Sequence, residues 1–145
     1  FSHDLIAKSG EFVVNLVDEA HCKALDFCGV RSGRDVDKWQ ECHLTPMKAL
    51  NMEYAPAIAE CPAYLACKVV QQLELGSHTM FVGKIVGVQV RDDLFAADGS
   101  LHLEKAGLVT YTHGTYQKAA DVLGFFGYSV ARPEVLKRRM DALTK

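Results

Sequence analysis

The sequence predicts a mainly β domain, an antiparallel barrel with helices around its periphery. Two long strand-like segments, residues 63–75 and 78–94, follow each other across a short glycine turn. The first alternates apolar and polar side chains, as a half-buried strand does. The second carries Gly83 and Gly87, where a bulge or a barrel bend would lie. A β-branched apolar run at residues 11–17 supplies a buried strand. Together these segments favour a barrel over a sandwich.

The remaining elements are shorter and mostly flank the strands. A first helix around residues 5–8 is expected, capped by Ser2 or Asp4 and ended by Gly10. The others are, in order, a helix over residues 18–27, a helix over 35–42, a long irregular loop over 44–62 with three prolines, a turn at 98–100, a strand over 107–111, and a terminal helix opened by Pro133.

Length and composition predict one soluble globular domain over residues 1–145. A net charge of −2 gives no field-driven attraction to nucleic acid or to an anionic membrane. No apolar run approaches the roughly 18–20 residues of a membrane helix. The first residues lack the charge and apolar block of a secretory signal. They also lack an initiator methionine, as expected of a processed or cropped chain.

The cysteines point to a reducing cytoplasm rather than to a disulfide scaffold. There are five, an odd number, and their spacings are long. His21-Cys22 and Cys42-His43 are adjacent pairs, but no C-x2-C or H-x3-H ligand spacing occurs. We therefore expect no metal site.

A candidate phosphate site lies between the second and third helices. Ser32, Gly33 and Arg34 precede a helix expected to begin near residue 35, and a helix N-terminus favours an anion. Gly33 lets the backbone approach a ligand closely. Arg34 and Lys38 are four residues apart and would share a helix face, where a phosphate gains two charge-assisted contacts. Cys28 lies just before this segment.

Two further groups suit a bound cofactor. His78 follows Gly76-Ser77 at the start of a long strand, where it can donate a hydrogen bond to a cofactor or substrate at neutral pH. Tyr111 and Tyr116 flank a histidine and a glycine after a strand. Aromatic faces with polar tips suit a flat heterocyclic ligand.

Each candidate also has a purely structural interpretation, which the residues alone leave open. The 35–42 helix can be a surface helix in which Asp37 neutralises Arg34 and Glu41 neutralises Lys38. His78 can be a strand-end histidine bonded to a loop carbonyl. The tyrosine segment can be an aromatic loop that covers one end of a barrel.

Five motifs in a fixed order carry a family resemblance: FSHDLI at residues 1–6, EFVVN at 11–15, CG at 28–29 with SGRDVDK at 32–38, GSHTMFVG at 76–83, and LGFFGYSVAR at 123–132. The chain resembles the flavin reductase-like, FMN-binding split-barrel family, most closely its flavoredoxin-type branch. The resemblance covers nearly the whole chain.

The resemblance implies a Greek-key split barrel that forms a homodimer, with FMN near the subunit interface. It implies flavin reduction by NADH or NADPH, or electron transfer to a redox protein partner. Around the flavin it places Ser2, His3 and residues 32–38. It places His78 on the reactive side of the ring, with the segment from Tyr111 to Tyr116 nearby.

The chain departs from the family pattern in two ways. Members usually carry a few tens of residues before the position of Phe1, which form the first strands and part of the flavin cradle. The chain is thus N-terminally incomplete relative to the family. Lys84 stands where an acidic residue is common after Gly83, which would alter an interfacial ion pair.

Two classes of function follow from these observations. The first is an FMN flavoprotein, either an NAD(P)H:flavin oxidoreductase or a flavoredoxin-like electron carrier. FMN is expected in preference to FAD because only one compact anion site, at Arg34 and Lys38, is recognisable. The second is a non-enzymatic split-barrel binding protein without bound flavin.

Overall fold

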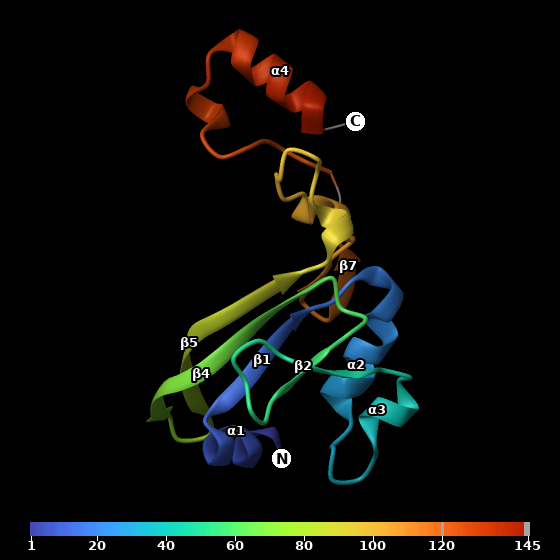
Figure 1. Cartoon of the computed structure of the whole chain (residues 1–145), viewed down its shortest axis with the longest axis vertical. Helices are drawn as coiled ribbons and strands as arrows, with labels where there is room; N and C mark the ends of the chain where they lie inside the picture. Colours follow the sequence, from blue (N-terminus) through green and yellow to red (C-terminus); the bar gives the residue numbers. More distant parts are fainter. Residues whose placement is uncertain (120, 144–145) are drawn as a thin grey trace.

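The computed structural model describes residues 1–119 and 121–143 and consists mainly of antiparallel strands (Figure 1). The strands are β1 (Glu11–Leu16), β2 (Pro46–Lys48), β3 (Pro56–Ile58), β4 (Ala63–Glu74), β5 (Thr79–Val90), β6 (Val109–Thr112) and β7 (Thr115–Lys118). The α-helices are α1 (Ser2–Ser9), α2 (Cys22–Val30), α3 (Lys38–Glu41) and α4 (Pro133–Leu143). Short 3-10 turns are η1 (Glu19–His21), η2 (Asp92–Leu94), η3 (Leu103–Ala106) and η4 (Tyr128–Val130).

The central sheet has the strand order β1-β4-β5, and both pairings are antiparallel. The register between β4 and β5 shifts at two places, and the strand glycines lie beside them: Gly83 pairs with Val69, and Gly87 pairs with Ala66. A Cβ on Gly83 would lie 2.5 Å from the Phe12 ring, so only glycine lets this ring pack on β5. The predicted strands and their bulges are confirmed.

The expectation of an irregular loop over residues 44–62 was wrong. This segment contains the β2–β3 hairpin, and its Ala49, Met52 and Ala57 form much of the core together with Tyr64 and Ala66. Two of the three prolines that suggested a loop, Pro46 and Pro56, stand at the first position of a strand, which sheets tolerate. The segment therefore packs against the sheet as part of the core.

The helices largely follow the sequence pattern, with differences at their ends. Gly10 ends α1 in the left-handed conformation (φ 69°), as predicted, but Phe1 rather than Ser2 or Asp4 occupies the N-cap position. The segment expected as one helix over 18–27 is divided into η1 and a longer α2. The helix expected over 35–42 is only the four-residue α3.

Within the C-terminal third, the β6–β7 hairpin lies beside α2, whereas α4 lies away from the central sheet (Figure 1). The turn at 98–100 is present, with the Ser100 amide bonded to the Asp98 carboxylate. The predicted strand near 109 is β6, which pairs with β7, a strand that the sequence did not predict. Pro133 opens α4 as expected, and α4 lies beyond the end of β5, apart from the sheets (Figure 1).

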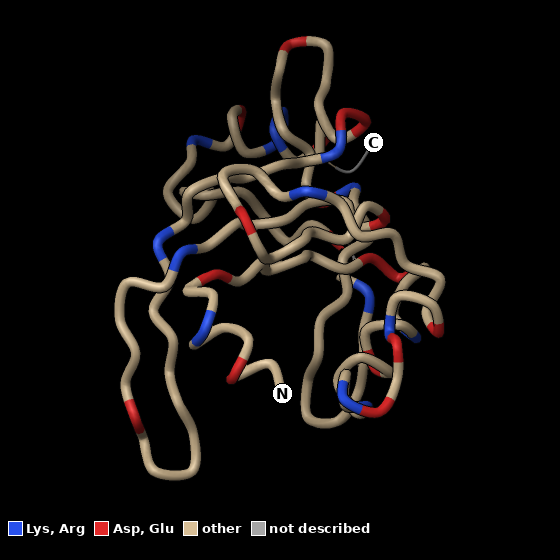
Figure 2. Tube along the Cα trace, turned by 60° about the horizontal axis from the view of Figure 1, so that its bottom comes forward, with Lys and Arg blue, Asp and Glu red and all other residues tan. Residues whose placement is uncertain are grey.

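Two further features are the distribution of charged residues and the lengths of the helices. Lysine and arginine are interspersed with aspartate and glutamate along the chain (Figure 2). No helix among residues 1–119 and 121–143 has the length and apolar character needed to cross a membrane.

Candidate functional site

A cavity of about 570 Å³ opens beside the loop between α2 and α3. It brings together Gly33, Arg34 and Lys38, three of the residues predicted to bind a cofactor. The aromatic rings of Phe1 and Trp39 contribute apolar walls. The complete lining is Phe1, Gly33, Arg34, Asp35, Val36, Asp37, Lys38 and Trp39. This combination of two cations and two aromatic rings suits a ligand with an anionic end and a flat apolar part.

The loop that forms the cavity floor is a tight turn around Ser32. The Ser32 carbonyl accepts hydrogen bonds from the amides of Asp35 and Val36, and its hydroxyl accepts one from the Arg34 amide at 3.1 Å. Gly33 is closely packed, since a Cβ there would lie 2.7 Å from the Phe1 ring. A glycine is therefore required for the N-terminus of the chain to pack on this loop.

Arg34 is already paired within the chain. Its Nη2 donates to Asp4 Oδ2 at 2.7 Å, and its guanidinium lies 5.5 Å from the centre of the Phe1 ring. The alternative interpretation, in which Asp37 neutralises Arg34, does not describe this contact, because the carboxylate partner is Asp4. A hydrogen bond from His3, together with the charge of Arg34, lowers the pKa of the Asp4 carboxyl. Asp4 therefore stays ionised, and an incoming phosphate has to displace it from a guanidinium that is largely exposed.

Lys38 is also engaged, and the helix that begins with it offers no free N-terminus. Its Nζ donates to the Cys28 carbonyl at 2.6 Å rather than pairing with Glu41. Asp37 caps α3 and accepts from the amides of Trp39 and Gln40. The expectation of a helix beginning near residue 35, with Arg34 and Lys38 on one helical face, was wrong, because Asp37 starts the helix later. The anion-binding groups of this loop are therefore its side chains, chiefly the two cations, rather than a helix N-terminus.

His78 lies in the turn before β5, and its Nδ1 is 2.8 Å from the Ser77 hydroxyl. The tip of the β4–β5 hairpin and the loop between α2 and α3 lie on opposite sides of α1 (Figure 1). Helix α1 connects the two sides: the His3 ring lies 5.5 Å from the Phe81 ring of β5, while Asp4 binds Arg34. The structure thus keeps His78 apart from the cations.

The two tyrosines belong to the β6–β7 hairpin and do not line the cavity. Their ring centroids are 5.0 Å apart, and the Tyr116 hydroxyl donates to Asp26 of α2 at 3.1 Å. Desolvation and the Asp26 carboxylate raise the pKa of Tyr116. The exposed Tyr111 ring is held by Tyr116 beside α2 rather than at the phosphate loop.

Ser2 lines a second, smaller cavity of about 270 Å³ together with Glu11 and Tyr54. Among the described residues, no group of three or more His, Cys, Asp and Glu side chains is arranged to hold a metal ion.

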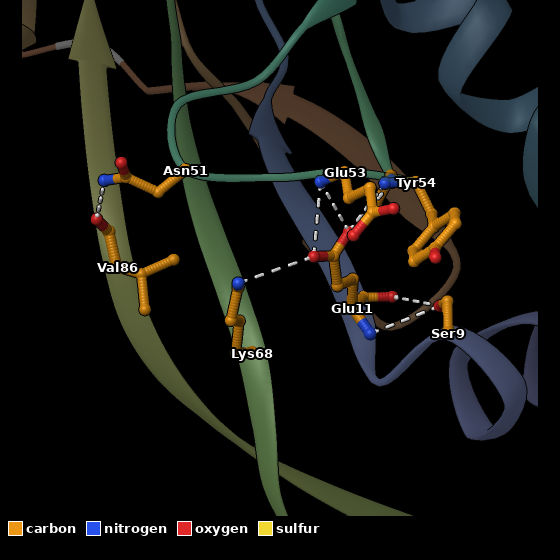
Figure 3. A network of polar contacts seen from close by, with 8 residues as sticks. Ser9, Glu11, Asn51, Glu53, Tyr54, Lys68 and Val86 are labelled. Atoms are coloured by element: carbon orange, nitrogen blue, oxygen red, sulfur yellow. Dashed lines mark hydrogen bonds and ion pairs between the residues drawn. The ribbon is translucent and has the colours of Figure 1, made fainter.

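Glu11 is a heavily hydrogen-bonded carboxylate that the sequence patterns did not single out (Figure 3). Its side chain is only 6% exposed and accepts from the backbone amides of Glu53, Tyr54 and Ala55. Lys68 on β4 lies 3.8 Å away. A charged residue that opens an otherwise apolar strand was the available signal. Glu11 fixes the chain at 53–55 against β1, next to the C-terminal end of α1.

Burial alone would raise the pKa of Glu11, but the three amide donors and Lys68 outweigh it and lower that pKa. We expect Glu11→Gln, which keeps the size but loses the charge, to reduce the free energy of unfolding by about 1–2 kcal/mol at neutral pH. A carboxylate with a lowered pKa stabilises the fold above the pKa of the unfolded chain, and this stability is lost as pH falls through the folded-state value.

The difference between wild type and Glu11→Gln should therefore disappear in acid. Urea unfolding at a series of pH values measures the free energy of unfolding of both proteins and its dependence on pH. Asp92→Asn, at an exposed carboxylate, is a control. A constant difference at all pH values would contradict the role given to the Glu11 charge.

Residues 1–120 match the model of the "Flavin reductase like domain" family. An uncharacterized protein of Archaeoglobus fulgidus is 38% identical over 88 residues, 61% of this chain and 49% of that protein. The reductase component of a 4-nitrophenol 4-monooxygenase/4-nitrocatechol 2-monooxygenase from Rhodococcus opacus is 30% identical over 61% of this chain and 43% of its own length. The chain spans about half the length of the curated relatives it matches.

Solved structures share the fold. The flavoredoxin of Desulfovibrio vulgaris (Miyazaki F) superposes with a TM-score of 0.81 at 25% identity, covering 90% of this chain and 70% of that one. A flavoredoxin from Methanosarcina acetivorans gives 0.75 at 29% identity, covering 90% and 71%. An FMN-binding protein from Thermus thermophilus gives 0.69 at 24% identity, covering 86% and 66%.

These neighbours confirm the split-barrel fold class, although the sheets of the described residues do not close into a complete barrel. The family model ends at residue 120, so a single domain over all of 1–145 stays a prediction. The match over most of the chain, together with the two flavoredoxin structures, shows that the chain belongs to the flavin reductase-like family and supports its flavoredoxin-type branch.

Proposed function

We propose that this chain is the FMN-binding domain of a flavoprotein oxidoreductase that accepts electrons from NADH or NADPH. The family supports a flavin-related oxidoreductase. The observation that carries the more specific proposal is the cavity beside the α2–α3 loop, where two cations and two aromatic rings meet. A phosphate-bearing aromatic cofactor satisfies both kinds of lining, whereas a neutral apolar ligand would gain no charge-assisted contact from the two cations.

The residues fit a flavin mononucleotide. Arg34 and Lys38 would hold the phosphate, with the Ser32 hydroxyl as an additional donor. The polar partners of the two cations can be exchanged for a phosphate: Arg34 binds a largely exposed Asp4 carboxylate, and Lys38 binds the Cys28 carbonyl. When bound, FMN supplies the hydride and single-electron chemistry, and the protein supplies position and electrostatics.

His78 would donate a hydrogen bond near the reacting edge of the flavin or beside the nicotinamide. Its contact with the Ser77 hydroxyl limits the orientations of the ring. The position of His78 on the other side of α1 from the cations agrees with this division, because the phosphate and the ring lie at opposite ends of FMN. Ser2 and His3, on α1, lie between the two groups.

Two other functions are compatible with the fold. One is a flavoredoxin-like electron carrier that passes electrons to a redox protein partner, which the two flavoredoxin neighbours favour. The other is a split-barrel binding protein without flavin. This function is favoured by the hydrogen bonds of Arg34 to Asp4 and of Lys38 to the Cys28 carbonyl, because both cations already have partners within the chain.

Absorbance spectra recorded before and after addition of NADH or NADPH separate the oxidoreductase, the electron carrier and the flavin-free binding protein. The purified full-length protein should show flavin absorbance, and the released cofactor should be FMN rather than FAD on chromatography. Bleaching on anaerobic addition of NADH or NADPH indicates an oxidoreductase. A flavin spectrum unchanged by either nucleotide indicates an electron carrier, and a colourless protein that fails to take up added FMN indicates the binding protein.

We also propose a homodimer. Strand β5 is an edge of the central sheet over twelve residues, and Met80, Val82, Ile85 and Val88 on it are exposed. An unpaired apolar edge is normally covered. The C-terminal segment carries a second apolar surface, on which Phe126 is fully exposed.

We expect Phe126→Asp to shift the protein from dimer toward monomer, because a charge would have to be buried at the interface. Phe125 is not the residue to change, since it already packs on Tyr128 and Arg139 within the chain. Light scattering at micromolar concentration measures the mass, and Val30→Asp adds the same charge at another exposed apolar position. A wild-type monomer under these conditions would refute the dimer.

A further inference from the structure

Four side chains between residues 98 and 104 form one continuous chain of hydrogen bonds. The Ser100 hydroxyl lies 3.2 Å from Nε2 of His102, and Nδ1 of the same ring lies 2.7 Å from Glu104 Oε1. The Ser100 hydroxyl also donates to Asp98 Oδ1 at 2.6 Å. A serine, a histidine and a carboxylate therefore follow one another in the order that activates a nucleophile.

The backbone brings the serine and the histidine to the same face. Residues 94–96 pair with residues 100–102 through two antiparallel backbone hydrogen bonds, of 2.9 and 2.8 Å. Side chains two positions apart in extended backbone point to the same side, so Ser100 and His102 lie next to each other. Leu94, at one end of this pairing, is only 2% exposed and anchors the loop in the protein.

Glu104 fixes the orientation of the His102 ring. When the Nδ1 proton is donated to Glu104, Nε2 is the nitrogen that carries a lone pair, and Nε2 is the one that faces Ser100. Burial raises the pKa of the Glu104 carboxyl, but the hydrogen bond from His102 and the neighbouring backbone outweigh burial and lower that pKa. Glu104 is therefore ionised at neutral pH, and it stabilises the imidazolium that forms when His102 takes a proton.

The amide of Leu101 supplies a hydrogen-bond donor next to the serine. Leu101 stands opposite Phe95 in the antiparallel bridge, between the two backbone hydrogen bonds, so its N–H points away from the paired segment. Within residues 1–119 and 121–143 this N–H has no hydrogen-bond partner. The amide that follows the nucleophile helps to bind the oxyanion in other serine enzymes.

A cavity of about 290 Å³ adjoins the carboxylate end of this chain of hydrogen bonds. One imidazole ring separates the Ser100 hydroxyl from Glu104, which lies in the wall of the cavity. The carboxylates of Asp98, Glu104 and Asp121 disfavour an anionic substrate, and most other wall residues are apolar. A small neutral ester fits these surroundings. The complete lining is Leu103, Glu104, Leu108, Ala119, Asp121 and Val122.

We propose that Ser100 is a nucleophile that takes the acyl group of small neutral esters, with His102 as its base and Glu104 as the residue that positions the ring. The hydroxyl hydrogen turns from Asp98 toward His102 by rotation about the Cβ–Oγ bond. Oγ then bonds to the ester carbonyl carbon while its proton passes to Nε2, and the bond to the alcohol breaks as the alcohol leaves with that proton. Water, deprotonated by His102, cleaves the acyl-serine to the acid and free Ser100, so atoms and protons balance. This activity needs no flavin.

The test uses the purified chain and a fluorophosphonate ester, a neutral electrophile that bonds to activated serine hydroxyls. Attack by Ser100 Oγ forms an O–P bond, breaks the P–F bond and releases fluoride and a proton, so the label stays on the protein. Trypsin releases the labelled segment as peptide 92–105, because Arg91 and Lys105 lie at its ends. Fragmentation of this peptide in the mass spectrometer shows whether Ser100 or His102 carries the label.

We expect the label on Ser100 in wild type and at the same rate in the control Ser129→Ala, which removes another exposed serine. Ser100→Ala should leave peptide 92–105 unlabelled. His102→Ala should slow labelling about a hundredfold, the lower end of what a positioned base contributes. Added imidazole should restore part of that rate, which it would not do if His102 had a purely structural role.

The role of Glu104 has a separate readout. Glu104→Gln should shift the pH dependence of labelling toward lower pH, because the imidazolium loses one carboxylate partner while the nearby charges of Asp98 and Lys105 stay. With 4-nitrophenyl acetate as substrate, wild type should release nitrophenolate faster than Ser100→Ala and carry an acetyl group on Ser100.

Two results would overturn the proposal. One is a wild-type chain in which Ser100 stays unlabelled or is labelled no faster than other exposed serines, and this result does not depend on the folding of any variant. The other is an equal labelling rate in wild type and His102→Ala. Neither result bears on the proposed flavin site, whose residues lie elsewhere in the chain.

Discussion

Arg34→Ala is expected to weaken FMN binding about ten- to a hundredfold while leaving the maximal rate of flavin reduction nearly unchanged. A charge-assisted phosphate contact contributes roughly 1.5–3 kcal/mol, which corresponds to that range of affinity. The phosphate is remote from the reacting ring, so its loss removes binding that ground state and transition state share. Titration of flavin fluorescence measures the affinity, and stopped-flow reduction at saturating FMN measures the maximal rate of flavin reduction.

Asp4→Asn makes the opposite change at the same site. It removes the carboxylate that holds Arg34 at 2.7 Å, so FMN should bind more tightly than to wild type. Arg31→Ala is the matched control, because Arg31 is exposed and does not line the cavity. Wild-type affinity in Arg34→Ala would mean that the phosphate binds elsewhere, and weaker binding in Asp4→Asn would mean that the ion pair shapes the site rather than competing with the ligand.

The elements that sequence predicted well are those whose pattern is local. The alternation in β4 and the strand glycines at Gly83 and Gly87 carry their own signal, and both appear where expected. Strand β7 consists of four exposed residues that pair with β6. It is too short for an alternation of apolar and polar residues to be recognised in the sequence. The 44–62 segment was misjudged because the meaning of a proline depends on its position in a strand, which only the fold defines.

The site shows the same limit more sharply. Sequence placed Gly33, Arg34 and Lys38 together, since they are close along the chain, and they do share a cavity. The structural alternative paired Arg34 with Asp37 for the same reason, but Asp37 caps α3, and the carboxylate that binds Arg34 is Asp4, thirty positions away. The contacts of Glu11 with residues 53–55 span more than forty positions. Local sequence patterns do not predict which carboxylate binds a given donor when the two residues are far apart in the sequence.

His78→Ala is expected to leave FMN bound and to slow its reduction by NADH or NADPH about a hundredfold. A hydrogen-bond donor that acts where charge moves contributes on this scale to the rate but little to ground-state binding. Anaerobic stopped-flow absorbance measures the reduction rate, and flavin titration measures the affinity. His78→Gln, which keeps a donor, should recover part of the rate. Ser77→Ala, which removes the hydroxyl 2.8 Å from the ring, should have a smaller effect of the same kind.

The double variant Arg34→Ala/His78→Ala tests whether the two ends of the site act separately. The loop between α2 and α3 and the β4–β5 hairpin lie on opposite sides of α1 (Figure 1), so neither side chain depends on the other for its position. Changes at such separated positions add: the double variant should show the affinity of Arg34→Ala and the rate of His78→Ala. If His78→Ala reduces bound flavin at the wild-type rate, His78 is a structural histidine at the strand end. Its hydrogen bond to Ser77 then serves the hairpin turn, and the hydride donor must be positioned by other groups.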